Sequence, residues 1–271
     1  MPFSPVVHWN FDPVALTLGP LPIHWYGICW AIAFFGAEFG VRRRLESIGR
    51  GDVDVSALIV CALLGTVAGA RLAHCLFYDP AFYLAHPLKI LAIWEGGMAS
   101  HGGAIGLMVA VAWGAPRYAP GLAPLTLLDA TSASAAFGGA VIRIANFLNS
   151  EIVGDPTSGA WGVVFDRVDA TPRHPVQLYE AGAYLLVFFV LRQAGRRGAL
   201  ARPGTLTGLF LALVFGARAL IETWKTPQAA YEAGHAITVG QWLSVPFVLI
   251  GLALIVRARR SPSPQPVAKP R

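Results

Sequence analysis

Residues 55–78 read VSALIVCALLGTVAGARLAHCLFY, a run in which Arg71 is the one residue of the Asp, Glu, Lys and Arg types. A helix needs about 20 consecutive, mostly apolar residues to cross the hydrocarbon core of a bilayer. This run is long enough and apolar enough to do so. It therefore predicts a membrane-spanning helix, and it sets the class of fold that we expect.

Other apolar stretches repeat this pattern along the chain. We predict seven membrane-spanning helices, over residues 23–41, 55–78, 98–115, 124–142, 177–191, 204–222 and 239–256. The fifth is short and begins among polar residues. The predicted fold is therefore an all-α, polytopic integral membrane protein.

The composition of the 271-residue chain agrees with this class. The residues Ala, Val, Ile, Leu, Met, Phe, Trp, Tyr and Cys make up 55% of it, and charged residues make up 13%. Soluble domains usually carry about 25% charged residues, and disordered chains have low hydrophobicity. Cys29, Cys61 and Cys75 lie inside apolar runs, without the spacing of a disulfide framework or a zinc finger. Disordered, disulfide-stapled and zinc-ribbon classes are therefore excluded.

The basic residues predict the orientation of the helices, because Lys and Arg are retained on the cytoplasmic side during insertion. Most of the 21 Lys and Arg residues follow the first, third, fifth and seventh predicted spans. They are Arg42, Arg43, Arg44, Arg50, Arg117, Arg192, Arg196, Arg197, Arg202, Arg257, Arg259, Arg260, Lys269 and Arg271. We therefore expect the N-terminus outside and the C-terminus in the cytoplasm. The net charge of +6 largely expresses this asymmetry, so it does not imply a nucleic-acid partner.

Three regions follow from these assignments. Residues 1–22 contain no Lys or Arg and no compact apolar segment typical of a signal peptide, so we expect an interfacial N-terminal arm. Residues 23–256 form the predicted seven-helix transmembrane domain. Residues 257–271 are basic and rich in Pro and Ser, which predicts a disordered cytoplasmic tail.

Residues 94–103 read WEGGMASHGG, where two Gly pairs flank His101 at the outer start of the third span. A histidine can accept a proton from a thiol or a hydroxyl group near neutral pH. The alternative is a packing histidine bonded to a carbonyl. Gly102 and Gly106 have the small-xxx-small spacing of a close helix–helix contact.

Residues 143–154 read RIANFLNSEIVG, at the outer end of the fourth span. Arg143 and Asn146 are three residues apart, so they share a helix face, and Glu151 could orient the arginine. A guanidinium group suits a phosphate, which it can bind in a bidentate manner. The alternative is an arginine that extends from the span end to the interface.

Other polar residues allow two interpretations. Arg218 and Glu222 have i,i+4 spacing, typical of an intrahelical salt bridge, although a second outer arginine could complete an anion clamp. Gln177 and Glu180 favour interfacial anchoring over catalysis. Arg71 is interpreted as a structural residue, and Arg167 and Lys225 as solvated loop charges. The sequence indicates no role for Asp129 or Glu38.

The arginines, a histidine, amides and a tyrosine thus gather at the outer ends of the predicted spans. Ionisable groups in spans are costly and usually face a cavity or a partner. This set suits an anionic headgroup, and lipid is the anionic ligand most available there. The spacing alone does not specify a reaction.

Six motifs also occur in a definite order. They are His24-Trp-Tyr26-Gly, Gly69-Ala-Arg71-Leu, Trp94-Glu-Gly-Gly-Met98 with His101-Gly-Gly103, Arg143-Ile-Ala-Asn-Phe with Asn149-Ser-Glu151, His174-Pro-Val-Gln-Leu-Tyr-Glu180, and Gly240-Gln-Trp-Leu-Ser244. Together they resemble bacterial prolipoprotein diacylglyceryl transferases, from about residue 23 to residue 250. The chain departs from the family at Ile142, Ala145 and Ser150, where the family usually has glycine.

The resemblance implies transfer of the diacylglyceryl group of phosphatidylglycerol to the lipobox cysteine of a prolipoprotein signal peptide. A thioether forms and glycerol phosphate leaves, in the first step of lipoprotein maturation. The enzyme would lie in the bacterial inner membrane, in contact with the lipid bilayer, with its active site facing outward. No metal or redox cofactor is implied.

The resemblance also implies roles for particular residues. The implied catalytic residues are His101 as general-base candidate, Arg143 and Arg218 at the leaving phosphate, and Tyr26 near the substrate or thiol. The implied substrate-binding residues are Arg143, Asn146, Glu151, Gly154, Arg218 and Glu222. The sequence does not decide which residue takes the thiol proton.

Three other classes of protein fit this sequence less well. A secondary transporter should show an internal repeat, and none is found. An intramembrane protease needs a Ser/Lys, Asp/Asp or His-Glu-x-x-His set, which the sequence lacks. A non-catalytic scaffold would not explain arginines at the outer face.

Overall fold

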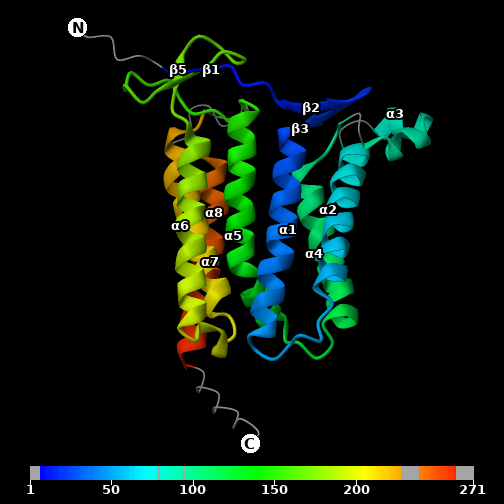
Figure 1. Ribbon diagram of the computed structural model, residues 1–271, viewed down its shortest axis with the longest axis vertical. Coiled ribbons are helices and arrows are strands. Elements are labelled where there is room, and N and C mark those ends of the chain that lie inside the picture. The colour runs from blue at the N-terminus through cyan, green and yellow to red at the C-terminus, as the bar shows by residue number, and fades with distance from the viewer. Residues whose placement is uncertain (1–6, 78–79, 94–95, 227–237, 261–271) are drawn as a thin grey trace, which may run out of the picture. The chain divides into compact units, whose positions relative to one another are not determined.

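The computed structural model describes residues 7–77, 80–93, 96–226 and 238–260. The chain divides into two compact units. The larger unit comprises residues 1–40 and 125–271, and the smaller unit comprises residues 41–124. Figure 1 labels the elements of both units, and each unit is described by itself.

The smaller unit is built around a close pair of helices, α2 (Val55–Phe77) and α4 (Ser100–Tyr118). A Cβ atom on Gly106 would lie 2.0 Å from the carbonyl oxygen of Gly65, and one on Gly69 would lie 2.3 Å from that of Gly102. Only glycine permits this backbone approach. The predicted small-xxx-small contact is therefore confirmed.

Arg71 holds the segment that joins these two helices, which contains α3 (Pro80–Ala85) and η1 (Pro87–Leu91). Its side chain is buried, and its nitrogens donate hydrogen bonds to backbone carbonyl groups of the segment. The acceptors are Lys89 at 2.5 Å, Ile90 at 2.9 Å, Ala92 at 3.2 Å, Gly97 at 3.2 Å, and Gly96. Arg71 is thus structural, as predicted, and its hydrogen bonds fix the connecting segment against α2.

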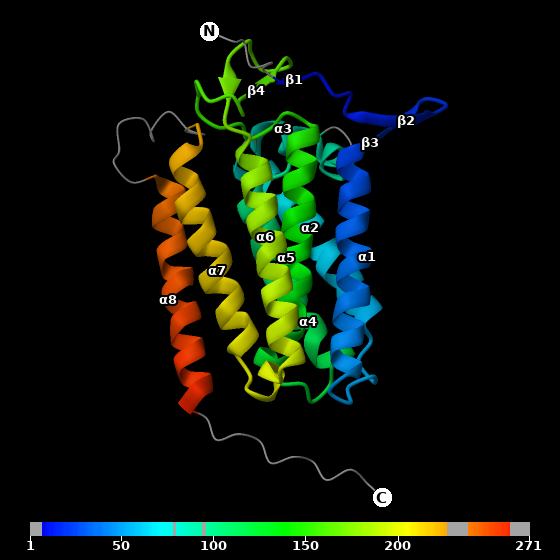
Figure 2. The ribbon, with the colours of Figure 1, turned by 60° about the vertical axis from the view of Figure 1, so that its left-hand side comes forward.

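The larger unit contains the first part of α1 (Trp25–Glu46), together with α5 (Pro124–Leu148), α6 (Val176–Arg196), α7 (Thr205–Ile221) and α8 (Val239–Arg260). Short 3-10 helices follow α6 and α7, namely η3 (Ala199–Ala201) and η4 (Glu222–Trp224). Helices α6, α7 and α8 run side by side in Figures 1 and 2. Ala136 of α5, Val187 and Leu191 of α6 and Leu206 of α7 form a buried apolar cluster.

Asp129 of α5 caps the start of α7. Its carboxylate accepts hydrogen bonds from the backbone N–H groups of Gly204 and Thr207, both at 2.7 Å, and from the Thr207 hydroxyl at 2.6 Å. The first N–H groups of a helix have no partner within the helix and favour a negative charge. Asp129, for which the sequence offered no role, therefore fixes α7 against α5.

Two small sheets make the all-α prediction incomplete. Strands β2 (Val14–Leu18) and β3 (Leu21–His24) form an antiparallel hairpin. Strand β4 (Val163–Phe165) pairs in parallel with β1 (Val7–Trp9) and antiparallel with β5 (Pro172–Arg173). Trp9 donates a hydrogen bond from Nε1 to the carbonyl of Phe147 at 3.0 Å. The sheet is thereby anchored to the end of α5, beside the predicted site.

Within the described residues, four helices are long and apolar enough to cross a membrane: Val55–Phe77, Pro124–Leu148, Thr205–Trp224 and Gly240–Arg260. The other three predicted spans overlap α1, α4 and α6. Large apolar side chains point outward from the helices, with Phe35, Leu64 and Leu186 each more than 60% exposed. The protein is therefore a mostly helical membrane protein.

The two ends of the chain differ in detail from the sequence assignment. The predicted N-terminal arm contains β1, β2 and the first two residues of β3, so strands make up much of its described part. Helix α8 continues to Arg260, so the segment predicted to be a disordered tail begins with helical residues. The rest of the predicted tail, 261–271, lies outside the described residues.

Candidate active site

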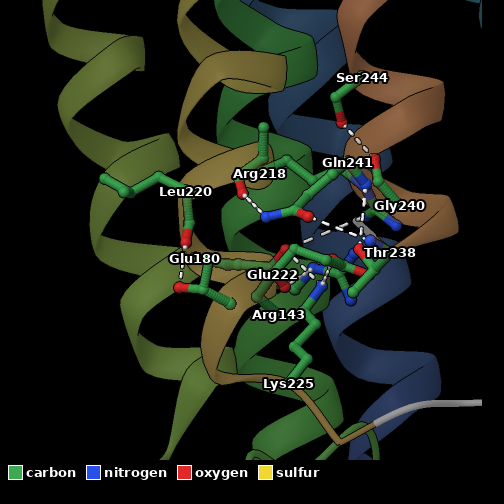
Figure 3. A network of polar contacts seen from close by, with 12 residues as sticks. Arg143, Glu180, Arg218, Leu220, Glu222, Lys225, Thr238, Gly240, Gln241 and Ser244 are labelled. Carbon is green, nitrogen blue, oxygen red and sulfur yellow. Dashed lines mark hydrogen bonds and ion pairs between the residues drawn. The ribbon is translucent and has the colours of Figure 1, made fainter. Parts of the chain in front are cut away.

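The carboxylate of Glu180, in α6, is the centre of a buried ionic cluster. Its side chain is fully buried. Nε of Arg143, in α5, lies 2.8 Å from Oε2, and Nζ of Lys225 lies 2.9 Å from Oε1 (Figure 3). An ionised group is tolerated in the protein interior when it is paired and hydrogen-bonded. Glu180 therefore draws two cations from different parts of the chain to one point.

Two further side chains complete this cluster. Nη1 of Arg218, in α7, lies 4.0 Å from Oε1 of Glu180, and its side chain is 32% exposed. Oε2 of Glu222 lies 3.1 Å from Nζ of Lys225. We call Arg143, Glu180, Arg218, Glu222 and Lys225 the ionic cluster. Its three cations and two carboxylates give it a formal charge of +1.

The helix ends explain why these residues meet. Arg143 lies near the end of α5, Glu180 near the start of α6 and Arg218 near the end of α7. Because consecutive helices of this bundle run in opposite directions, these ends lie together (Figure 2). Glu222 extends the contact to α8, since a Cβ atom on Gly240 would lie 2.2 Å from its Oε1.

A polar relay extends from Arg143 along the end of α5. Its Nη1 donates a hydrogen bond to Oδ1 of Asn146 at 3.1 Å, and Nδ2 of Asn146 donates to Oε2 of Glu151 at 3.1 Å. Asn149 donates from Nδ2 to the other oxygen of Glu151 at 3.2 Å. The structure therefore brings Arg143, Asn146 and Glu151 together on one side of the helix end.

The relay depends on how α5 ends. Ser150 has φ +57°, and its N–H bonds to the carbonyl of Phe147 at 3.1 Å. The N–H of Glu151 bonds to the carbonyl of Asn146 at 2.9 Å. This pair of bonds is the Schellman arrangement, in which a left-handed residue reverses the chain. Ser150 thus adopts the conformation for which glycine is favoured, and the turn places Glu151 back beside Asn146.

Gly154 lies at a backbone junction. Its N–H donates to the carbonyl of His174 at 3.0 Å, and it forms an isolated antiparallel bridge with Lys225. A Cβ atom here would lie 2.5 Å from the His174 oxygen and 2.7 Å from the Trp224 oxygen. This contact explains the need for glycine by backbone packing.

Arg173 secures the same junction from β5. It donates from Nη1 to the carbonyl of Gly154 at 3.1 Å and from Nη2 to Oδ2 of Asp169 at 2.5 Å. The Arg173 guanidinium holds the pKa of the Asp169 carboxyl below its usual value by hydrogen bonding. The junction is therefore stabilised by a charged pair as well as by backbone bonds.

The structure places Tyr26 and His101 in different units. Tyr26, in the first turn of α1, packs against a buried cluster formed by Cys29, Ala33, Val141 and Ala145. His101 is the second residue of α4, in the smaller unit, and its side chain is not among those that the structure describes. Their predicted roles therefore stay predictions.

Three interpretations of charged and polar residues are wrong. Arg218 approaches Glu180, and within the described residues it forms no salt bridge with Glu222. Lys225 is 7% exposed and paired with two carboxylates, so it is no solvated loop charge. Glu180 and Gln177 are fully buried, and Gln177 donates to the Glu151 carbonyl at 2.6 Å, so neither anchors the chain at an interface.

One feature of the sequence could have indicated that Glu180 is a buried partner of the cations. Arg143, Arg218 and Lys225 all lie at predicted outer span ends, and such an excess of cations in a low-dielectric region needs a buried anion. Glu180 is a carboxylate at another outer span end. The pairing itself joins residues that are 37 and 45 positions apart, beyond any local spacing rule.

Chemically, the ionic cluster suits an anion. Arg218 keeps a partly exposed guanidinium at a distance from Glu180, and Arg143 is oriented on both sides by Glu180 and Asn146. Arginine presents a planar set of donors that matches a phosphate. Among the described residues, no group of three or more His, Cys, Asp and Glu side chains could hold a metal ion.

The apolar helices and the positively charged cluster define a helical membrane protein with a site suited to an anionic ligand. Comparison with known families makes the assignment specific. The model of the family "Prolipoprotein diacylglyceryl transferase" matches residues 13–257. The chain belongs to this family, and it is a transferase.

Curated relatives match over nearly the whole chain. A protein of Tolumonas auensis is 50% identical over 251 residues, which cover 93% of this chain and 97% of the relative. Proteins of Methylocella silvestris and Chloroherpeton thalassium are 43% and 41% identical, covering 96% and 95% of this chain and 98% and 96% of the relatives. All three are named phosphatidylglycerol–prolipoprotein diacylglyceryl transferase.

Proposed function

We propose that this protein transfers the diacylglyceryl group of phosphatidylglycerol to the lipobox cysteine thiol of prolipoprotein signal peptides. A thioether forms and glycerol phosphate is released, which is the first step of bacterial lipoprotein maturation. The family membership and the names of the relatives support this reaction. The structural observation that carries it is the convergence of Arg143 and Arg218 on one buried carboxylate.

The chemistry of the reaction explains why this convergence matters. The cysteine sulfur attacks a glycerol carbon, the carbon–oxygen bond to the phosphate breaks, and the bonding electrons leave with the phosphate. Negative charge therefore grows on the leaving group. Fixed cations in a site of low dielectric constant stabilise such a charge. We assign Arg143 and Arg218 to the phosphate.

The thiol must also lose its proton, because the thiolate is the nucleophile. His101 is the proposed general base. Tyr26 is proposed to bind substrate or to tune the thiol. Neither role needs a metal or redox cofactor.

Further residues are proposed to bind or position the substrate. Asn146 and Glu151 orient Arg143 through the hydrogen bonds described above, and they lie beside the headgroup. Glu222 is proposed to act on the Arg218 side of the site. Gly154 contributes by allowing the backbone junction that holds Lys225.

We further propose that all seven long helices cross the bacterial cytoplasmic membrane, with the N-terminus outside, the C-terminus in the cytoplasm and the active site facing outward. The asymmetry of the basic residues supports this orientation. The final turns of α6 and α8 carry Arg196 and Arg257, Arg259 and Arg260. Within the larger unit these two helices end on the same side (Figure 2).

The three regions of the chain keep the proposed roles of arm, catalytic domain and tail. Leu16, Leu18 and Leu21 of the β2–β3 hairpin are exposed. Exposed apolar side chains on a strand hairpin favour contact with the membrane interface. Residues 23–256 form the catalytic domain, and the tail from residue 257 lies in the cytoplasm.

Activity is tested with the purified full-length protein in detergent. It is incubated with phosphatidylglycerol labelled in the glycerol backbone of its diacylglyceryl group and with a peptide that carries a lipobox cysteine. We expect label on the peptide in a bond that resists mild base, as a thioether does, together with glycerol phosphate. A peptide with serine in place of the cysteine is the matched control. Failure to modify the cysteine peptide contradicts the proposed reaction.

Topology is tested by labelling introduced cysteines, after Cys29, Cys61 and Cys75 have been replaced. Cysteines at Asp155 and at Thr226 should react with a membrane-impermeant thiol reagent from outside the cell. A cysteine at Gly198 should react only after the membrane is opened. Labelling of the Gly198 position from outside, with the Asp155 position protected, contradicts the orientation.

A further inference from the structure

Lys225 is buried between two carboxylates, and the reaction proposed above assigns it no role. Its side chain is 5% exposed, and its Nζ lies 2.9 Å from Oε1 of Glu180 and 3.1 Å from Oε2 of Glu222. One ammonium group thus contacts both carboxylates of the ionic cluster (Figure 3). A buried ammonium group loses much of its hydration, and contact with carboxylates compensates for that loss.

The backbone at Lys225 is fixed as closely as the side chain. Residues 154 and 225 form an antiparallel bridge, and the N–H of Asp155 bonds to the carbonyl of Trp224 at 2.8 Å. The absence of a side chain at Gly154 allows this approach. The junction therefore delivers the ammonium group to one place, between the two carboxylates.

This arrangement sets the charge balance around the two arginines. Without Lys225, the cluster would hold two guanidinium groups and two carboxylates, and its formal charge would fall from +1 to zero. Oε1 of Glu180 would lose its nearest cation. Arg218, whose Nη1 is 4.0 Å from that oxygen, is the cation best placed to replace it.

We propose that Lys225 is a positioning residue, which neutralises Glu180 and Glu222 so that Arg143 and Arg218 stay available to a phosphate group of the lipid substrate. This inference rests on the proposed function. Lys225 itself contacts no reacting atom. Oε2 of Glu180 already pairs with Nε of Arg143. Lys225 acts by occupying Oε1 of Glu180 and Oε2 of Glu222, which would otherwise draw Arg218 and the remaining donors of Arg143.

The first test compares two replacements of Lys225 in the full-length protein. Lys225→Met removes the charge and should lower kcat/KM for phosphatidylglycerol about 100-fold, as truncation of one partner in a buried charged pair does. KM and the dissociation constant for phosphatidylglycerol in nanodiscs should both rise. Lys225→Arg keeps the charge and should retain most of the activity. Arg167→Met, which removes an exposed cation from the same unit, is the matched control and should behave like wild type.

The second test separates charge balance from folding. In Lys225→Met/Glu222→Gln a carboxylate is removed together with the ammonium group, which restores the formal charge of +1. The proposal predicts that this double variant recovers at least about tenfold in affinity relative to Lys225→Met, since coupled sites show interaction energies of this size. A purely structural role predicts that the two losses add. Thermal unfolding of each variant shows whether it is folded.

The outcomes are distinct. Wild-type affinity in Lys225→Met, or a double variant weaker than Lys225→Met, overturns the role of Lys225. Binding of phosphatidylglycerol by wild type without transfer to the peptide contradicts the proposed function. In that case the affinity measurements still decide the role of Lys225, because they do not depend on turnover.

Discussion

Arg71 and Arg143 both lie towards the ends of helices, yet their side chains have different kinds of partner. Arg71, in the smaller unit, donates to five backbone carbonyl groups, and within the described residues it pairs with no carboxylate. Arg143, in the larger unit, pairs with the carboxylate of Glu180 and the amide of Asn146. The difference shows that Arg71 is structural, and it supports the site role proposed for Arg143.

The acceptors explain the difference. When the carbonyl groups of one segment accept hydrogen bonds from every N–H group of a guanidinium, the segment is held in place. The arginine then has no donor left for a ligand. A carboxylate shared by several cations leaves them close together with charge in excess. Arg218 illustrates this, because its partly exposed guanidinium lies 4.0 Å from a carboxylate oxygen that Lys225 already occupies.

The largest expected effect is the loss of Arg143. Arg143→Ala removes a guanidinium from the leaving phosphate and should lower kcat about 10³-fold or more, as removal of an arginine that stabilises transferring phosphate does. Arg143→Lys should also be poor, because an ammonium group lacks the planar donor set. The measurement is the initial rate of peptide modification at saturating phosphatidylglycerol.

Arg218→Ala extends this test within the ionic cluster. It should resemble Arg143→Ala if both guanidinium groups bind the phosphate. Full activity of a well-expressed Arg143→Lys variant would show that bidentate geometry is unnecessary. Full activity of Arg218→Ala would remove Arg218 from the catalytic set.

The next effect concerns His101, in the smaller unit. If its imidazole takes the thiol proton, His101→Gln should reduce the rate by about 10²–10⁴-fold. The wild-type rate should also fall at acid pH, where the imidazole of a general base becomes protonated. That limb of the pH–rate profile should vanish in the variant.

A loss of less than about tenfold would instead indicate a packing or binding histidine, since one hydrogen bond contributes about 0.5–1.5 kcal/mol. An unchanged rate and an unchanged pH profile would exclude proton transfer by His101. The two units would then differ more clearly in function, because all the proposed groups that act on the reacting atoms would lie in the larger unit.

A smaller effect on activity, but a large one on stability, is expected at Arg71. Arg71→Lys keeps the charge but cannot reach five carbonyl groups, so the free energy of unfolding should fall by about 3 kcal/mol. Thermal unfolding in detergent measures this change. Arg117→Lys, at an exposed arginine of the same unit, is the control and should change stability little. A stable Arg71→Lys protein with weakened phosphatidylglycerol binding would place Arg71 beside Arg143 in function.

The smallest effect is expected at Ser150, where α5 ends. Its φ of +57° is costly for serine, and its hydroxyl is buried without a hydrogen-bond partner among the described residues. Ser150→Gly should therefore stabilise the protein by up to about 1 kcal/mol, with activity retained. Ala145→Gly, within the same helix, should destabilise it by about 1 kcal/mol. Loss of activity in Ser150→Gly would show that the serine hydroxyl has a role in the site.

The sequence predicts the helical segments well, because long apolar runs and close glycine spacing are local signals. Gly102 and Gly106 show this in α4, where the predicted close contact is present. The strands were missed because the longest, Val14–Leu18, has five residues, and β1 and β4 pair across more than 150 positions. No periodicity develops over such lengths.

The candidate site was predicted in part for the same reason. The contact between Arg143 and Asn146 follows from helical spacing, and it is present at 3.1 Å. The partner of Arg218 could not be derived in this way, since i,i+4 spacing favoured Glu222 and the structure pairs it with Glu180. Lys225 was interpreted as a solvated loop residue. Its burial results from a backbone junction with a distant segment, which the neighbouring sequence does not indicate.

The burial of Glu180 also constrains the synthesis of the protein. An ionised side chain inside a span costs about 2.5–3.5 kcal/mol during insertion by the translocon. Helix α6, which carries Glu180, is not among the helices that meet the length and hydropathy requirement for a span within the described chain. Arg143 precedes it in the chain, whereas Arg218 and Lys225 follow it. In the proposed topology, we therefore expect α6 to insert together with α5, whose Arg143 pairs with Glu180, and we expect Arg218 and Lys225 to join this pair after α7 has emerged.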